Sequence, residues 1–166
     1  MRSEWVPHET INHVLVALMP PNRLAIEVSM RYGMRIGDVL SMRREDVVRG
    51  SWTYKEEKTG KSRRIRLSEL LQQRLLAQSG RIFIFEHRTD WKRHRTRQAI
   101  YKDIRRAAKA FRLEEHVSPH SARKIYAVDA YKRYGDIKRV QKLLNHSSEA
   151  VTMIYALADA LDKKKG

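Results

Sequence analysis

The sequence predicts an α+β fold that is mostly α-helical and contains one small antiparallel β-sheet. Apolar residues recur at helical spacing through most of the chain, which is the pattern of amphipathic helices. Two stretches with alternating faces, SWTYKEE and SRRIRLS, flank KTGK at 58–61, where Gly60 favours a hairpin turn. No repeat or linker divides residues 1–166, and this length is usual for one domain.

Proline, glycine and apolar spacing predict the N-terminal elements. Residues 8–19 carry apolar side chains at helical spacing, and the two prolines at 20–21 end this first helix. The pattern then repeats as far as Gly33, where glycine suits the positive φ of a helix C-terminus. RIGDVLSM at 35–42 predicts a third helix. The pair VV at 47–48 predicts a short strand ahead of the two hairpin strands.

Two further helices are expected after the hairpin. SELLQQRLLAQS has Ser68 at a suitable N-cap position and leucines in helical spacing. IFIF at 82–85 predicts a short buried extended segment, and the following RTDWKRHRTR is too charged for the core. RQAIYKDIRRAAKAF then places its alanines, isoleucines and Phe111 on one helical stripe.

The C-terminal part of the chain predicts three more helices. Ser118 and Pro119 suit the N-cap and the first helical position, and Gly135 ends that helix. Asp136 suits the N-cap of DIKRVQKLLN, whose apolar residues face inward. SSEAVTMIYALAD predicts the last helix.

Composition points to a nucleic-acid partner. The chain has 35 Lys+Arg against 19 Asp+Glu, a formal net charge of +16 and a pI near 10.4. Its 42% hydrophobic residues exclude a disordered basic tail. Without cysteine, the chain has no disulfides, thiol catalysis or Cys-containing zinc sites. The apolar run VLVALM is far shorter than the roughly 20 residues that span a bilayer, so we expect a soluble, cytoplasmic protein.

Two arginine-containing motifs stand at helix starts. In SPHSAR, His120 and Arg123 are three residues apart and share a face. A phosphate beside that face meets an imidazole, a guanidinium and the positive end of the helix dipole. In GMRIGD, Asp38 follows Arg35 at a spacing that lets it orient the guanidinium. Either motif alone has an ordinary explanation as a polar first turn.

Three more polar residues are ordinary when taken singly. Lys58 lies in the basic hairpin turn, where exposed lysines are common. His146 follows the helix end LLN and precedes a Ser-Ser cap, so it suits a capping or surface role. Tyr155 lies among apolar residues, where a tyrosine most often packs into a core.

As an ordered set, these residues resemble the catalytic signature of the tyrosine recombinases, the phage integrase family. That signature has G-x-R-x-x-[ED], a hairpin lysine, H-x-x-R at a helix start, an L-G-H-like histidine, and a tyrosine nine residues later. The matching segments here are GMRIGD, EKTGK, HSAR, LLNHSS and Tyr155, spread over residues 8–158. The resemblance implies the tyrosine recombinase catalytic-domain fold.

The resemblance also implies a role for each residue. Tyr155 is the expected nucleophile, which forms a covalent 3′-phosphotyrosine without metal or ATP. Arg35 and Arg123 are expected to bind the non-bridging phosphate oxygens. His146 adds a hydrogen bond to the same oxygens. The remaining roles are Lys58 as the acid for the leaving 5′ oxygen, His120 as an aid to proton transfer at the tyrosine, and Asp38 as support for the first arginine.

This chain departs from the family pattern in places, and the resemblance also implies its domain content and its partners. Asn145 replaces the usual glycine before His146, and asparagine tolerates the left-handed conformation. We expect residues 1–166 to be the catalytic domain alone, without the N-terminal DNA-binding domain of most members. The expected partner is double-stranded DNA in a bacterial or phage-infected cell. We expect a monomer in isolation and a tetrameric synaptic complex on DNA.

No cofactor or metal is expected. The sequence has no acidic cluster for Mg²⁺ and no GxxxxGK[ST] for a nucleotide. His116 and His120 are four apart, but Pro119 interrupts the helix between them and no third zinc ligand is evident. Three alternatives remain open at this point: a type IB topoisomerase, a non-catalytic DNA-binding module derived from a recombinase, and a structural basic protein.

Overall fold

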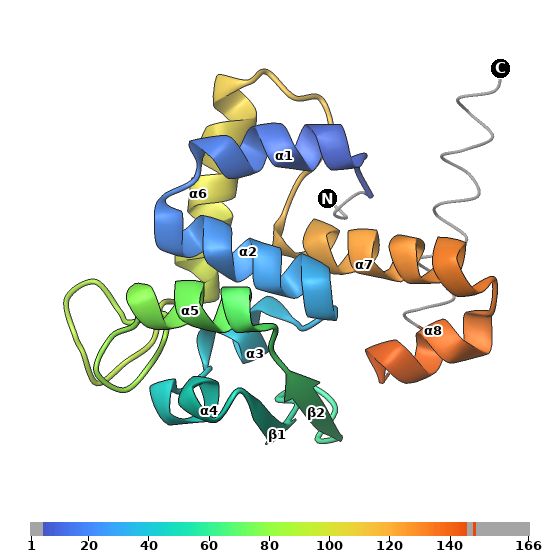
Figure 1. The fold of residues 1–166 in the computed structure, drawn as a ribbon. Coiled ribbons are helices and arrows are strands. Elements are labelled where there is room, and N and C mark those ends of the chain that lie inside the picture. Colours follow the sequence, from blue (N-terminus) through green and yellow to red (C-terminus); the bar gives the residue numbers. More distant parts are fainter. Residues whose placement is uncertain (1–4, 146–147, 149–166) are drawn as a thin grey trace, which may run out of the picture.

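Helices make up most of the chain in the computed structural model, which describes residues 5–145 and residue 148 (Figure 1). The helices are α1 (His8–Ala17), α2 (Pro20–Tyr32), α3 (Ile36–Leu40), α4 (Arg44–Arg49), α5 (Glu69–Ala77), α6 (Arg97–Ala110), α7 (Pro119–Tyr134) and α8 (Ile137–Leu144). The strands β1 (Ser51–Lys55) and β2 (Ser62–Arg66) form an antiparallel hairpin. The predicted fold class is therefore confirmed.

The helix signals in the sequence act where they were expected. Gly33 and Gly135 end α2 and α7 with φ of 64° each. Ser118 caps α7 through a reciprocal capping box with Ser121, and Pro119 occupies the first turn. Asn145 ends α8 with φ of 54°, so asparagine takes the left-handed conformation in which glycine is usual.

The strand predicted at 47–48 is wrong, because these valines belong to α4. Glu45 and Asp46 lie in the first turn of this helix, Arg49 lies in its last, and Gly50 ends it with φ of 73°. Val47 is buried, whereas Val48 is 56% exposed. Only one of the two adjacent valines therefore faces the core.

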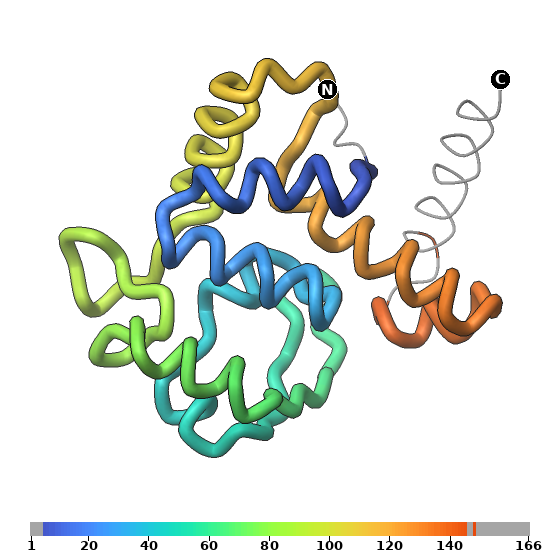
Figure 2. The backbone as a smooth tube through the Cα atoms, turned by 45° about the horizontal axis from the view of Figure 1, so that its top comes forward, coloured from blue at the N-terminus to red at the C-terminus, as the bar shows by residue number. Residues whose placement is uncertain are grey.

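The core lies between α2 and the helices around it. α2 packs against α7 and α3, and α1 packs against α6. A separate small apolar cluster joins α7 to α8, made of Ala127, Ala130, Val140 and Leu144. Figures 1 and 2 show α7 leaving the main body and leading to α8 at its edge. The 16-residue helix α7 thus has its first turn in the core and its last turn at the edge of the molecule.

The helix predicted over SSEAVTMIYALAD lies outside the described residues, apart from residue 148. Within the part of the chain that the structure describes, no helix is long and apolar enough to cross a membrane.

Candidate active site

Arg35 is held at the turn between α2 and α3. Gly33 ends α2, and Arg35 is the N-cap residue of α3, with its carbonyl oxygen accepting a hydrogen bond from the Val39 amide at 3.0 Å. Its Nη1 donates to Oε2 of Glu56 at 2.9 Å. The side chain is only 14% exposed. Both the main chain and the guanidinium of Arg35 are thus fixed.

Lys58 lies in the turn that joins β1 to β2. The Glu56 amide donates to the Lys61 carbonyl oxygen at 3.0 Å, and the Gly60 amide donates to the Glu56 carbonyl oxygen at 2.9 Å. Gly60 has φ of 66°, a backbone conformation that glycine adopts without strain. Lys58 itself is exposed at this turn.

His120 and Arg123 both lie in the first turns of α7 but differ in burial. His120 is exposed, and its amide donates to the Ser118 hydroxyl at 3.2 Å. Arg123 is 1% exposed and is the largest fully buried side chain among the described residues. Its Nη1 donates to the Gly33 carbonyl oxygen at 2.7 Å, and its Nη2 donates to the Leu144 carbonyl oxygen at 2.8 Å.

One pocket of about 220 Å³ brings these four predicted residues together. Its lining includes Arg35, Lys58, His120 and Arg123. They come from the α2–α3 turn, the β-hairpin and α7, which are far apart in the sequence. Arg97, at the start of α6, lines the same pocket, and sequence reasoning did not single it out. The pocket is therefore rich in cations and suits an anionic group such as a phosphate.

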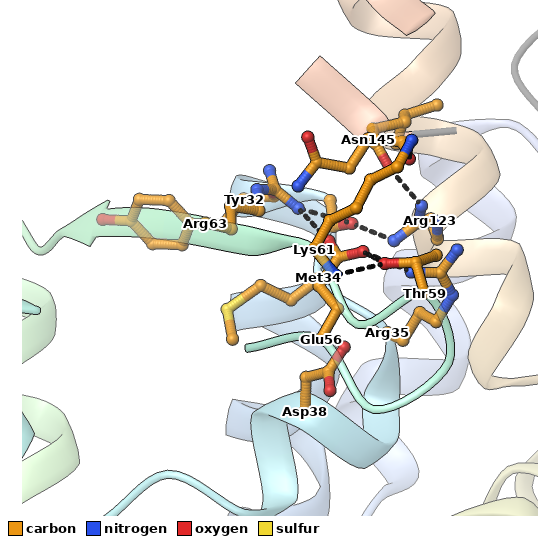
Figure 3. Close-up of polar contacts among 12 residues, drawn as sticks. Tyr32, Met34, Arg35, Asp38, Glu56, Thr59, Lys61, Arg63, Arg123 and Asn145 are labelled. Carbon is orange, nitrogen blue, oxygen red and sulfur yellow. Dashed lines mark hydrogen bonds and ion pairs between the residues drawn. The ribbon is translucent and has the colours of Figure 1, made fainter. Parts of the chain in front are cut away.

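A buried carboxylate lies behind these cations. The Glu56 side chain is fully buried, and its Oε2 accepts hydrogen bonds from Arg35 and from the Thr59 hydroxyl, the latter at 2.7 Å. Oε1 lies 3.9 Å from Nη1 of Arg63. Arg63 in turn donates to the carbonyl oxygens of Tyr32 and Gly33 (Figure 3). Glu56 and Arg63 were also missed from the sequence, where a charged hairpin indicates solvent exposure.

Asp38 is buried beside this network rather than paired with Arg35. Its Oδ1 accepts a 3.1 Å hydrogen bond from the Glu57 amide, while Glu56 provides a carboxylate contact to Arg35. Burial raises the pKa of Asp38 above its usual range, and the neighbouring Glu56 and Glu57 charges add to this effect. The Glu57 hydrogen bond and Arg35 oppose the rise in pKa. The contact of Asp38 is with the hairpin backbone.

His146 and Tyr155, the two remaining predicted site residues, lie outside the described residues. The last residues before His146 contact the site. The Asn145 carbonyl oxygen accepts a 3.2 Å hydrogen bond from Nζ of Lys61, and the Leu144 carbonyl oxygen contacts Arg123. The C-terminal end of α8 is therefore tied to the hairpin and to α7 beside the pocket (Figure 3).

Metal ligands do not gather in the described part of the chain. Across residues 5–145 no group of three or more His, Asp or Glu side chains is arranged to hold a metal ion. His116 contacts Nη1 of Arg105 through its Nδ1 at 3.4 Å.

Known proteins resemble this chain in sequence and in fold. The model of the phage integrase family matches residues 4–161. The chain belongs to the phage integrase family. A probable integrase/recombinase of Bacillus subtilis, YoeC, is 35% identical over 135 residues, which cover 74% of this chain and 69% of the relative. A tyrosine recombinase of Thermosipho africanus is 25% identical over 92% of this chain and 56% of the relative.

Solved structures of the family share the fold. The lambda integrase dimer bound to a COC′ core site superposes with a TM-score of 0.75 at 23% identity, covering 92% of this chain and 59% of the integrase. XerA recombinase gives a TM-score of 0.68 at 20% identity, covering all of this chain and 67% of XerA. The integrase of Escherichia phage P2 is 26% identical over 154 residues, and the chain spans 42% of its length. This chain thus spans 42% to 69% of the length of the three curated relatives.

Proposed function

We propose that this chain is the catalytic domain of a site-specific DNA recombinase or integrase. It breaks and rejoins DNA through a covalent 3′-phosphotyrosine on Tyr155, without metal or ATP. The observation that carries the proposal is the single pocket lined by Arg35, Lys58, His120 and Arg123. Family membership over residues 4–161 supports it independently.

The two arginines stabilise the transition state in this proposal. Attack on a phosphodiester places extra negative charge on the two non-bridging oxygens, and fixed hydrogen-bond donors lower the energy of that state. Planar guanidinium groups match this geometry, and Arg35 and Arg123 are held by Glu56 and by main-chain carbonyl oxygens before any substrate arrives. Such fixed cations take the place that metal ions occupy in many nucleases.

The other residues move protons and complete the phosphate site. The Tyr155 oxygen bonds to phosphorus as the bond from phosphorus to the 5′ oxygen breaks. Lys58, exposed at the hairpin turn, gives its proton to the departing 5′ oxygen. His120 assists removal of the tyrosine proton, His146 donates to a non-bridging oxygen, and Asp38 supports the Arg35 region through the hairpin. A second 5′-hydroxyl then reverses the step and joins new strands.

Double-stranded DNA is the proposed partner. The net charge of +16 favours backbone binding, and lambda integrase and XerH have been solved as DNA complexes. A lambda integrase tetramer has been solved on a Holliday junction. By analogy, we place this protein in the cytoplasm as a monomer that assembles into a tetramer on DNA.

Relaxation of supercoiled plasmid in EDTA at low salt tests the proposal without knowledge of a target site. Wild type is compared with Tyr155→Phe and Arg123→Ala, and trapped protein–DNA adduct is scored on denaturing gels. The expected result is relaxation with adduct in the wild type and neither in the two variants. Wild-type protein that binds DNA but gives no adduct would contradict the proposal. A strand-transfer assay then separates a recombinase from a topoisomerase.

A further inference from the structure

Glu56 has surroundings that its place in the sequence does not suggest. It lies in a basic hairpin of a protein with net charge +16, yet its side chain is fully buried. A buried carboxylate is costly unless cations and hydrogen bonds compensate for lost hydration. Arg35 and the Thr59 hydroxyl donate hydrogen bonds to Oε2 at 2.9 and 2.7 Å, and Arg63 adds an ion pair at 3.9 Å from Oε1, which accepts no hydrogen bond from the described residues.

Glu56 also joins two parts of the pocket. Its main chain closes the turn that carries Lys58, through hydrogen bonds to Lys61 and Gly60. Its side chain holds the Arg35 guanidinium. Because one residue makes both contacts, the Lys58 turn and Arg35 have a fixed relative position.

The Glu56 carboxylate is also connected to Arg123 through other residues. Arg63, the ion-pair partner of Glu56, donates to the Gly33 carbonyl oxygen, and Nη1 of Arg123 donates to that same oxygen at 2.7 Å. A continuous series of ion pairs and hydrogen bonds therefore runs from Arg35 through Glu56, Arg63 and Gly33 to Arg123. Such networks restrain their members more strongly than isolated pairs do.

From this geometry we infer that Glu56 is a positioning residue, which sets the guanidinium of Arg35 relative to Lys58 and, through Arg63, to Arg123. It does not touch the phosphate itself. The inference rests on the proposed function for its effect on catalysis. Its effect on the Arg35 side chain is independent of that function.

Two variants, Glu56→Gln and Glu56→Ala, weaken the contact of Glu56 with Arg35 to different extents. Gln keeps an acceptor for Arg35 and Thr59 but loses the charge, which roughly halves the strength of a charge-assisted hydrogen bond. Ala removes the acceptor altogether. Glu45→Gln is the matched control, because Glu45 pairs with Arg43 at 3.3 Å on the exposed surface of α4. Thermal unfolding confirms that each variant is folded.

The first readout is the Nη–Hη signal of Arg35 in ¹⁵N NMR spectra, assigned by its loss in Arg35→Lys. In the wild type and in Glu45→Gln this signal should keep one shifted position. In Glu56→Ala it should move away from that position, with Glu56→Gln between them. An unchanged Arg35 signal in Glu56→Ala would overturn the inference whether or not the protein cleaves DNA.

The second readout is the rate of adduct formation against DNA affinity. Glu56→Gln should slow adduct formation about 10-fold and Glu56→Ala about 100-fold, while DNA affinity changes less than about 3-fold. Tighter DNA binding with an unchanged rate would mean that Glu56 only lowers the positive charge, and would overturn the inference. If the wild type itself forms no adduct, the proposed function fails, and the NMR result alone decides the role of Glu56.

Discussion

Nη1 of Arg123 donates a 2.7 Å hydrogen bond to the carbonyl oxygen of Gly33, 90 residues earlier in the chain. This contact joins the first turns of α7 to the C-terminal end of α2. Arg63 shares the same carbonyl oxygen. The position of Arg123, a proposed catalytic cation, therefore depends on the backbone of one glycine.

Gly33→Ala should destabilise the protein by at least about 2 kcal/mol, since a left-handed alanine costs roughly 1–2 kcal/mol and a Cβ here also overlaps the Tyr126 ring. Gly135→Ala is the matched control, because Gly135 has the same φ of 64° and no atom within 4 Å of an added Cβ. The free energy of unfolding should fall by about 1 kcal/mol in Gly135→Ala. Urea unfolding measures both, and equal losses would show that the Tyr126 contact is unimportant.

Arg123→Lys should reduce adduct formation by at least about 100-fold, because an ammonium group cannot reach both the Gly33 and Leu144 carbonyl oxygens and still face the phosphate. Arg23→Lys provides the control, since Arg23 is a half-exposed partner of Glu27 on α2. That control should retain wild-type activity. Near-normal cleavage by folded Arg123→Lys would remove Arg123 from the proposed mechanism.

Asp38→Asn should make the protein more stable at neutral pH relative to wild type. Burial raises the pKa of Asp38 in the folded state, so the folded protein binds this proton more tightly than the unfolded chain does. Wild-type stability therefore falls as pH rises from 3.8 through the raised pKa. The gain from Asp38→Asn should vanish below that window. Urea unfolding at several pH values measures this gain, and a gain independent of pH would contradict the assigned cause.

Asp103→Asn should instead make the protein less stable at neutral pH. Burial alone would raise the pKa of Asp103, but hydrogen bonds from Asn22, the Met19 amide and Arg106 outweigh it and lower the pKa below 3.8. The stability that ionised Asp103 contributes is thus fully present above pH 3.8 and is lost as pH falls through the lowered pKa. The variant should lose about 1–3 kcal/mol at neutral pH. The same unfolding series should show this loss shrinking in acid, and a loss that grows in acid would refute the assignment.

The sequence was most informative where local signals decide structure. Ser118, Pro119 and Gly135 define α7 by capping and by backbone preference, and Gly60 defines the hairpin turn. These effects depend on neighbouring residues only. The prediction at 47–48 was wrong because two β-branched residues are too short a pattern to outweigh the charges and Gly50 that favour a helix.

Only those site residues that belong to the family motifs could be predicted from the sequence. The resemblance to the tyrosine recombinase signature led to Arg35, Lys58, His120 and Arg123, which share one pocket. It gave no hint of Glu56 or Arg63, since the burial of Glu56 comes from packing of the hairpin against Arg35 and the end of α2. Asp38 shows the same limit, because its spacing from Arg35 suits a direct contact that the structure gives to Glu56.

Mapping the covalent link between protein and DNA tests the central claim most directly. Adduct formed in EDTA on end-labelled DNA is digested with protease, and the DNA-linked peptide is sequenced by mass spectrometry. The account predicts a phosphate on Tyr155 joined to the 3′ side of the break, with a free 5′-hydroxyl on the other strand end. A link to any other residue, or to a 5′ phosphate, would contradict it.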